Sequence, residues 1–447
     1  MTESQSRIGV ALSGGGNRAA LFAIGALMYF VDSGKNRSTS AISSVSGGTL
    51  ANGFVAQCGA FDQQTSESFR NELKPLIRCM ARSSPLWGWW GTWLYLLVVI
   101  AAVAGVIGVG VYAPLEPWLR WLVGVVGLAI IERVLVRNRT VIVSWAFRAK
   151  LYHGTGGATL LAQLPKSSVD HVFCATDLHA GEHVYFSRNF VYSYRHGGGS
   201  PGCLPLDTAV QASSCFPGAL PARWIRTSQF HFPPRTEGIP LPQMALVDGG
   251  VYDNMGEQYL TDIDNRKKRD DGFPKEIVQP NEIIIVNSSG NEEVSSQWRL
   301  KLPFVGELFG LLRVINTLFD NTTTTRRSFL FERFVDHRPD GCFVSIERSP
   351  QYTAATISKT TKDPDVAQRA SDVLKLLSGQ PKEYWDDLAK ANTHASTTFR
   401  GLGDNRTTDL LWHGYLSAMC NSHVVLGYPL PGKVPSRTDF LTYVQNS

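Results

Sequence analysis

The chain has 447 residues, of which 43% are hydrophobic and only 18% are charged, below the roughly 25% of charged residues typical of soluble proteins. The net charge of +5 suits an anionic membrane surface, and nucleic acid is not expected as a partner because the one basic run, Arg266–Arg269, is short. Seven cysteines, without a C-x-x-C pair, argue against a disulfide framework or a zinc site and favour a reducing compartment.

The first predicted elements are an apolar strand, Ile8–Leu12, and an apolar helix, Ala19–Phe30, with a glycine turn between them. The turn contains Gly14, Gly15 and Gly16, which let the backbone approach a ligand closely, and the helix start offers free N–H groups to an anion. The sequence fits neither a P-loop nor the G-x-G-x-x-G spacing of a dinucleotide site. It leaves two possibilities, a loop that binds an oxyanion and a tight turn without a ligand.

A serine, Ser46, lies on a tight turn between a predicted strand that ends at Ser44 and a predicted helix that starts at Thr49. A nucleophile elbow has the pattern G-x-S-x-G, because small neighbours relieve the crowding of a strained strand-to-helix turn. Gly48 matches the second glycine, Ser44 stands in place of the first, and the N–H of Gly47 would add a donor for an oxyanion. A Ser-Gly-Gly turn is also common in proteins that catalyse nothing.

A long uncharged stretch, Ser83–Leu115, follows, and its centre, Trp93–Tyr112, has the length of a helix that spans about 30 Å, the thickness of the bilayer's hydrocarbon core. Tryptophan and tyrosine crowd its ends, as in interfacial belts. A second helix, Trp118–Leu135, would return, although Arg120 and Glu132 weaken its apolar character. The sequence predicts a transmembrane hairpin or, alternatively, a hydrophobic cap that enters one leaflet.

Arginines flank both ends of this stretch, including Arg78, Arg82, Arg137 and Arg139, whereas the turn at its tip contains neither lysine nor arginine. By the positive-inside rule, both ends lie on the cytoplasmic side. The expected localisation is therefore an integral membrane protein whose catalytic domain is cytoplasmic.

A carboxylate comes last among the candidate site residues. The apolar run of residues 240–247 leads into Asp248, followed by Gly249 and Gly250. Open α/β sheets place site residues at strand ends of this kind. An isolated Asp-Gly-Gly is most often a turn, but together with the glycine turn and the serine it becomes a candidate base.

Together these segments resemble the patatin-like phospholipase family. The likeness rests on residues 14–18, 44–48 and 248–251, with support from residues 173–178 and 209–221. It covers residues 8–56 and about 170–290, and the spacing agrees with a long insertion after the serine.

The resemblance implies a Ser–Asp dyad, in which Ser46 is the nucleophile and Asp248 takes its proton and later activates water. It also implies that the glycine loop holds the acyl oxyanion. The oxyanion-hole residues would be Gly14, Gly15, Gly16 and Gly47. The supporting residues would be Arg18, Gly48, Gly249 and Gly250. No metal and no cofactor is required by this mechanism.

Two positions depart from the family pattern, Ser44 in the elbow and Ala19 after Arg18, where the family usually has glycine. Histidine offers a different base, since His179, His183 or His413 could pair with Ser46. None of the three lies in a segment with the character of a turn.

We therefore expect an α/β fold of three α/β/α layers, patatin-like, with a mostly parallel central sheet and an inserted transmembrane hairpin. The first part of the catalytic domain would occupy residues 1–82, the hairpin residues 83–140, and the remainder with a C-terminal helical extension residues 141–447. The expected function is a membrane-associated serine acyl hydrolase of the phospholipase or lipase type. Its partners would be the bilayer and a membrane phospholipid or other acyl lipid. The alternatives are a catalytically silent protein that binds lipid or a partner, and a lipid acyltransferase.

Overall fold

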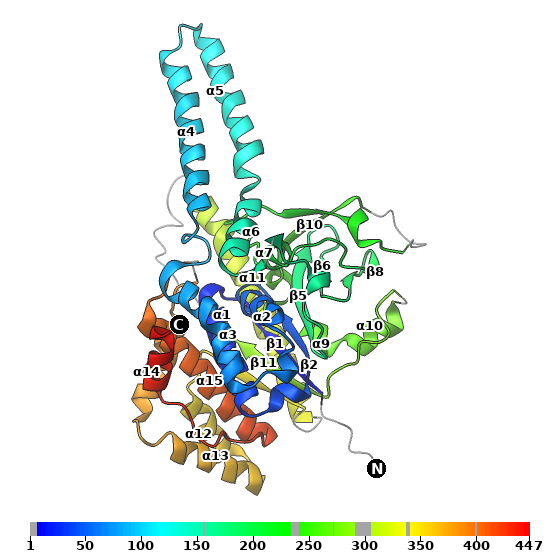
Figure 1. The fold of residues 1–447 in the computed structure, drawn as a ribbon, viewed down its shortest axis with the longest axis vertical. Coiled ribbons are helices and arrows are strands. Elements are labelled where there is room, and N and C mark those ends of the chain that lie inside the picture. The colour runs from blue at the N-terminus through cyan, green and yellow to red at the C-terminus, as the bar shows by residue number, and fades with distance from the viewer. Residues whose placement is uncertain are drawn as a thin grey trace.

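The computed structural model describes residues 7–154, 157–233, 241–270, 272–290, 305–336, 340–397 and 400–447. Its centre is a ten-stranded sheet, and a pair of long helices projects from one end of the molecule (Figure 1). The first strand, β1 (Ile8–Leu12), begins at the end of the sheet farther from this helical pair and runs toward the base of the pair.

Five neighbouring strands at one end of the strand order are parallel, in the order β12-β11-β1-β2-β5. Their bounds, besides those of β1, are β2 Thr39–Ser44, β5 Asp170–Asp177, β11 Glu282–Asn287 and β12 Gly341–Ser345. β1 and β11 are apolar and almost wholly buried, as expected for parallel strands that are covered on both faces. The predicted parallel character of the central sheet is confirmed here.

Beyond β5 the pairing is antiparallel, which the sequence analysis did not predict. β6, β7 and β8 extend the sheet as a meander, and β10 pairs with both β5 and β9. The bounds are β6 Glu182–Phe186, β7 Val191–Ser193, β8 Gly197–Gly199, β9 Arg223–Arg226 and β10 Gln243–Asp248. A separate small sheet pairs β3 (His153–Gly154) with β4 (Gly157–Ala158).

Alternate residues of the strands pack against two helical layers, which confirms the three-layer arrangement. In β1, Val10 and Leu12 belong to one apolar core and Ala11 to the other. The first core includes α1 Gly16–Asp32, α2 Gly47–Cys58, α3 Ser66–Arg78, α6 Arg139–Lys150, α7 Leu206–Ser213, α12 Pro350–Thr360, α13 Pro364–Leu376, α14 Lys382–Thr393, α15 Asp404–Leu426 and α16 Arg437–Gln445. The second core includes α9 Gln258–Thr261, α10 Ile263–Arg269 and α11 Val305–Asp336.

The projecting pair consists of α4 (Trp90–Tyr112) and α5 (Pro117–Ile131), and α5 continues into a π-helical turn, Glu132–Val136. The 23 residues of α4 extend about 35 Å at 1.5 Å per residue. Among the described residues, α4 is the one helix that is long and apolar enough to cross a membrane, by length and composition only. α5, with 15 residues, is shorter than α4. The predicted helical hairpin is present, whereas its crossing of a bilayer stays a prediction.

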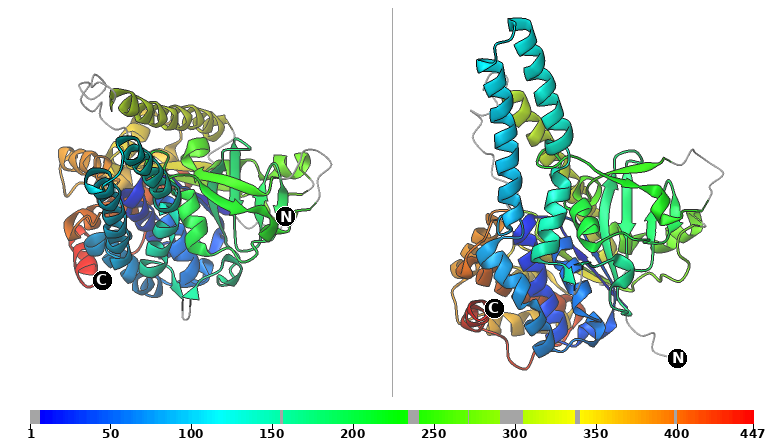
Figure 2. Two further views of the ribbon diagram at one scale, coloured as in Figure 1. Left: turned by 90° about the horizontal axis from the view of Figure 1, so that it is seen from above. Right: turned by 45° about the horizontal axis from the view of Figure 1, so that its top comes forward.

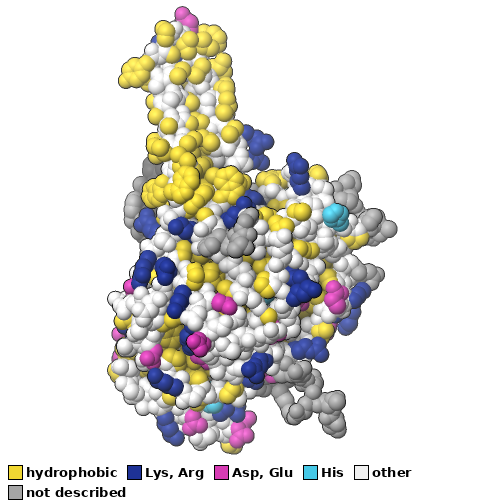
Figure 3. All heavy atoms as spheres, in the orientation of Figure 1, with side chains coloured by type: hydrophobic (Ala, Val, Ile, Leu, Met, Phe, Trp, Pro, Cys, Tyr) yellow, Lys and Arg dark blue, Asp and Glu magenta, His cyan; other side chains and the backbone are white. Residues whose placement is uncertain are grey.

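Hydrophobic side chains cover both arms of this hairpin (Figure 3). Seen from above, the hairpin stands between the C-terminal helices and the antiparallel strands (Figure 2). At its tip, Arg120 Nε donates to the carbonyl of Leu115 at 2.9 Å. At its base, Tyr95 Oη donates to the carbonyl of Leu135 at 3.1 Å, so the two arms leave the body of the protein side by side.

Candidate active site

The register of β5 brings the serine and the aspartate together. Ser44, at the end of β2, is opposite Phe173, and Asp248, at the end of β10, is opposite Ala175. Phe173 also pairs with Phe186 of β6, so β6 occupies one edge of β5 while β2 and β10 share the other. The two strands run in opposite directions and end beside each other, and the turns that carry Ser46 and Asp248 therefore meet.

Ser46 has the strained backbone of a nucleophile elbow, with φ 50° and ψ −116°. The next two residues must be glycine because other backbone lies too close. A Cβ on Gly47 would lie 2.2 Å from the carbonyl oxygen of Gly16, and a Cβ on Gly48 would lie 2.5 Å from that of Leu12. The serine turn and the glycine turn are thus in direct contact.

The departure at Ser44 is accommodated by hydrogen bonds. Its buried hydroxyl donates to the carbonyl of Val172 at 3.0 Å and accepts from Asn52 Nδ2 at 2.8 Å and from Thr49 Oγ1 at 3.2 Å. A buried hydroxyl is costly only when it lacks partners. A serine in this position is therefore compatible with the elbow.

Asp248 is buried, with 1% of its surface exposed. Its Oδ1 accepts from the N–H of Gly250 at 2.9 Å, while Oδ2 has no hydrogen bond of normal geometry to any described residue. Burial raises the pKa of Asp248 from 3.8 to about 6, and the interactions with the Gly250 N–H and the Ser46 side chain lower it in part. A carboxyl with this pKa is a better base near neutral pH than an ordinary aspartate.

The end of α7 connects the serine turn to the aspartate turn. The N–H of Ser46 donates to Ser213 Oγ at 3.1 Å, and Ser214 Oγ donates to the carbonyl of Ser46 at 3.4 Å. The same segment accepts from the aspartate turn, since the N–H of Asp248 donates to the carbonyl of Cys215 at 2.9 Å and that of Gly249 to Ser213 at 3.2 Å. This segment supported the family resemblance in the sequence, but no role was predicted for it. The two adjacent serines at the end of this helix were the feature of the sequence from which a role in the site could have been predicted.

Three backbone donors in the glycine turn and the serine turn are available to a ligand. Within the described residues, the N–H groups of Gly15, Gly16 and Gly47 have no hydrogen-bond acceptor. Gly15 and Gly16 have φ values of 136° and 61°, which favour glycine. The N–H of Gly14, by contrast, donates to the carbonyl of Asn254 at 2.9 Å. Gly14 instead provides space, because a Cβ there would lie 3.3 Å from the Cβ of Ser46.

Arg18 is buried and binds the C-terminal part of the chain. Its Nη1 donates to the carbonyl of Thr393 and, at 3.5 Å, to that of Ala395. Next to it, Asn17 Nδ2 donates to the carbonyl of Arg400 at 2.9 Å. Arg18 therefore ties the start of α1 to the end of α14. These contacts were not predicted from the sequence, where Arg18 was expected to be a supporting residue of the site.

None of the three candidate histidines forms a hydrogen bond with Ser46 among the described residues. His183 Nε2 lies 3.0 Å from the carbonyl of Gly249, and His413 Nε2 lies 3.3 Å from that of Arg348. Burial lowers the pKa of both to about 4. His179 Nδ1 lies 3.9 Å from Asp177. The described part of the chain also contains no group of three or more His, Cys, Asp or Glu side chains that could hold a metal.

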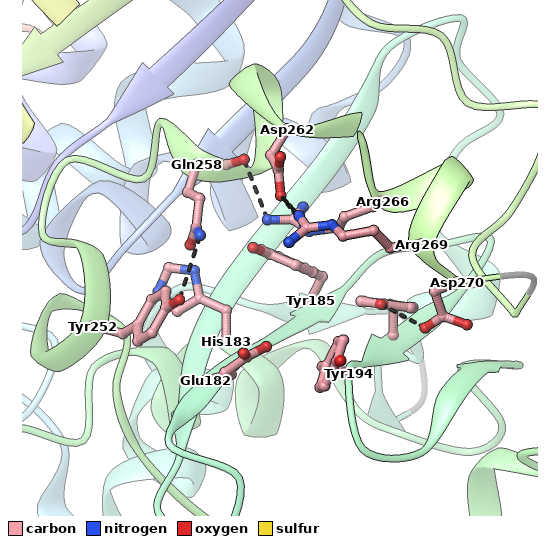
Figure 4. A pocket seen from close by; sticks show the side chains of 11 residues that line it. Glu182, His183, Tyr185, Tyr194, Tyr252, Gln258, Asp262, Arg266, Arg269 and Asp270 are labelled. Atoms are coloured by element: carbon pink, nitrogen blue, oxygen red, sulfur yellow. Dashed lines mark hydrogen bonds and ion pairs between the residues drawn. The ribbon is translucent and has the colours of Figure 1, made fainter. Parts of the chain in front are cut away.

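A separate polar cavity of about 170 Å³ is lined by side chains of β6, β7, α9 and α10 and of neighbouring residues (Figure 4). Arg266 stacks over the ring of Tyr185 there, 4.5 Å from its centroid. Neither Ser46 nor Asp248 lines this cavity. It approaches the dyad through His183, whose Nε2 contacts the backbone of Gly249. His183 thus connects the lining of this cavity to the aspartate turn.

Solved structures offer only distant likenesses to this chain. The human GIVD cytosolic phospholipase A2 is 12% identical with a TM-score of 0.37, over 69% of this chain and 45% of that one. VipD from Legionella pneumophila is 11% identical with a TM-score of 0.23, over 98% and 90%. The chain spans less than half the length of the first of these proteins, and both scores are too low to bear on fold or activity. Among curated protein sequences, none matches this chain significantly.

The family model for patatin-like phospholipases matches residues 10–261. This range includes the glycine turn, Ser46, the hairpin and Asp248. Family membership supports a lipid acyl hydrolase activity in general terms. Since the model covers more than half of the chain, the protein belongs to the patatin-like phospholipase family.

Proposed function

We propose that this protein is a membrane-associated serine acyl hydrolase of the phospholipase or lipase type, with Ser46 as nucleophile and Asp248 as base. The observation that carries the proposal is the meeting of a strained serine turn with a buried carboxyl whose pKa is raised to about 6. A strained elbow presents its hydroxyl to a substrate, and a desolvated carboxylate is a stronger proton acceptor than one in water.

The reaction begins when Ser46 Oγ attacks the carbonyl carbon of a lipid ester and Asp248 accepts the hydroxyl proton. The tetrahedral oxyanion is then stabilised by the N–H groups of Gly15, Gly16 and Gly47. Collapse expels the alcohol, which takes the proton from Asp248, and leaves an acyl-serine. Asp248 next removes a proton from water, which attacks the acyl-serine. Collapse of this second intermediate releases the fatty acid, and the departing Ser46 oxygen takes the proton back from Asp248.

Two helix starts support the oxyanion role of these glycines. α1 begins at Gly16 and α2 at Gly47, and the two glycines are in contact. Both helices therefore direct the positive end of their dipole to the same point. Loss of one donor from an oxyanion hole typically costs about 100- to 1,000-fold in rate.

The hairpin supports membrane attachment with a cytoplasmic catalytic domain. α4 is apolar and exposed, and aromatic side chains lie at both of its ends, including Trp90, Trp93 and Tyr112. β1 runs toward the base of the hairpin, so the turns at the carboxyl ends of β1 and β2 lie on that side of the molecule. A substrate in the bilayer surface would thus meet the dyad directly.

Labelling of the full chain in detergent with a fluorophosphonate tests this proposal, because the probe bonds only to an activated serine. The wild type should be labelled. Ser46→Ala should abolish labelling, and Asp248→Asn should slow it by about 100- to 10,000-fold, the usual contribution of a general base. Ser378→Ala, on an exposed turn distant in sequence, is the matched control and should label normally.

Normal labelling of Ser46→Ala would disprove the nucleophile, and normal labelling of Asp248→Asn would disprove the base. Folded wild-type protein without labelling would favour the catalytically silent alternative. The structure weakens the sequence argument for that alternative, because the hydrogen bonds of Ser44 accommodate its departure from the elbow pattern.

A further inference from the structure

A groove of about 560 Å³ lies at the base of the hairpin, between α6, the start of α7 and β9. α6 begins three residues after the π-helical turn that ends the second arm of the hairpin. The guanidinium of Arg137, at this junction, lies 5.9 Å from the ring centroid of Trp224 on the rim of the groove. The groove therefore adjoins the place where the hairpin leaves the body of the protein.

The groove is basic and contains an unused donor. Arg148, Arg223 and Arg226 line it. One carboxylate, Asp207, pairs with Arg148 at 3.1 Å and also interacts electrostatically with Arg223. Arg223 Nη1 is buried without a hydrogen-bond partner among the described residues. Three guanidinium groups against one carboxylate leave a net positive charge, which suits an anion with several oxygens.

The rim of the groove has the composition of a membrane interface. Trp145 and Trp224 line it with 46% and 43% of their surfaces exposed. Exposed tryptophans also mark the base of α4, at Trp90 and Trp93. Tryptophan concentrates at the headgroup level of bilayers. Basic side chains surround the base of the hairpin on the face shown in Figure 3.

We propose that this groove binds the phosphate of an anionic phospholipid headgroup, with Arg223 and Arg226 as the phosphate donors and Trp145 and Trp224 against the glycerol and the first acyl carbons. The proposal rests on the membrane attachment in the proposed function and is independent of the dyad. Occupancy would anchor the body of the protein at a fixed height on the membrane surface, with the carboxyl ends of β1 and β2 toward the lipid.

Native mass spectrometry of the full chain in detergent micelles, with equal amounts of phosphatidylglycerol and phosphatidylcholine added, tests the site. The wild type should retain phosphatidylglycerol preferentially. Because the Arg226 side chain is exposed, Arg226→Gln should leave the fold intact. The substitution should reduce the preference for phosphatidylglycerol about fivefold, the usual effect of one basic residue near an anionic surface. Arg223→Gln with Arg226→Gln should reduce the preference by about 25-fold.

Arg37→Gln is the matched control. Arg37 is exposed and precedes β2, at the end of the sheet opposite the Ser46 turn, so its loss should leave the preference unchanged. An unchanged preference in Arg226→Gln and the double variant would overturn the proposal. Inorganic phosphate that displaces the lipid at equal concentration would also overturn it, because the site would then be one for free phosphate.

Fluorophosphonate labelling of the same samples separates this proposal from the dyad. Labelling of Ser46 should persist in Arg226→Gln while the lipid preference falls. A wild type that selects phosphatidylglycerol without labelling would refute the hydrolase and support the groove. A wild type that is labelled without any lipid preference would support the hydrolase and refute the groove.

Discussion

Ser46 and Asp248 are each held in a state that costs free energy. The backbone of Ser46, with φ 50°, is of a kind that costs about 1–3 kcal/mol in a residue other than glycine. The pKa of Asp248, raised from 3.8 to about 6, corresponds to roughly 3 kcal/mol of destabilisation once the pH exceeds both values. The sign follows from proton binding: between these values the folded state holds more protons than the unfolded state, so stability falls as the pH rises.

The same pKa predicts how the reaction depends on pH. Only the charged form of Asp248 accepts a proton, so the second-order rate of serine labelling should rise with pH, half-maximally near pH 6, and level off above it. An aspartate in water would give the inflection near pH 4. Stopped-time labelling of the full chain between pH 4 and 8 measures the profile.

The slow residual labelling of Asp248→Asn provides the control for this profile. It should lack the inflection near pH 6. An inflection that persists in Asp248→Asn would assign the titration to another group and contradict the role of Asp248. His183, whose Nε2 contacts the carbonyl of Gly249, is one such candidate, although burial lowers its pKa to about 4.

At the scale of elements, the end of α7 positions both halves of the site. Ser213 Oγ accepts from the N–H of Ser46 and donates to the carbonyl of Cys174 at 2.6 Å, and it lies 2.8 Å from Thr49 Oγ1. Ser213→Ala removes the acceptor of the buried Ser46 N–H, whereas Thr49 Oγ1 keeps its bond to Ser44, so we expect a loss of about 1–3 kcal/mol in the free energy of unfolding. Labelling of Ser46 should slow as well, because the elbow loses the contact that fixes its N–H.

Ser214→Ala is the comparison for that variant. Ser214 Oγ also donates to the carbonyl of Val210 at 2.7 Å, and its bond to Ser46 is long, at 3.4 Å. Its removal should therefore affect labelling less than Ser213→Ala does. Chemical denaturation followed by fluorescence, together with labelling rates at a temperature where both variants are folded, checks the order. Equal effects would show that Ser213 has no particular role in positioning Ser46.

The sequence was sufficient for features that depend on local order. Strand, glycine turn and helix follow one another around Gly14 and Ser46, so their existence could be predicted from neighbouring residues. The direction of β10 could not be predicted in this way, because the apolar run before Asp248 does not specify whether it pairs with β5 in a parallel or an antiparallel manner. Contacts between distant segments, such as Ser213 with Ser46, depend on the assembled sheet for the same reason.

The C-terminal helices show the same limit. A C-terminal helical extension was predicted from the sequence, and its packing was not: α15 packs directly along α1. A Cβ on Gly25 would lie 2.1 Å from the carbonyl oxygen of Leu411, and a Cβ on Gly414 would lie 2.1 Å from that of Phe22. Gly25, an unfavourable residue within a helix, is thus explained by this close crossing. With Arg18 bound to the end of α14, the C-terminal helices hold the element that carries the glycine turn.

At the scale of the whole molecule, the hairpin and the body are structurally distinct. The most apolar 18-residue window of α4 has no buried residue, and the hairpin projects beyond the sheet and its two helical layers (Figure 1). The arms leave the body in contact, since Tyr95 hydrogen-bonds the backbone of Leu135. The sheet, the dyad and the C-terminal helices therefore gain little stability from the hairpin beyond this base.

This separation predicts that the hairpin can be removed without loss of the site. Replacement of residues 96–134 by a short glycine-serine linker joins Tyr95 to Leu135, which are already adjacent. The shortened chain should fold and be labelled at Ser46 by a fluorophosphonate, but it should not float with phospholipid vesicles. The full chain should fold, be labelled and float with the vesicles. A shortened chain that is folded but unlabelled would identify the hairpin as a cap required by the dyad. One that still floats would place the main membrane contact on the body, where the basic groove beside Trp224 is the first surface to mutate.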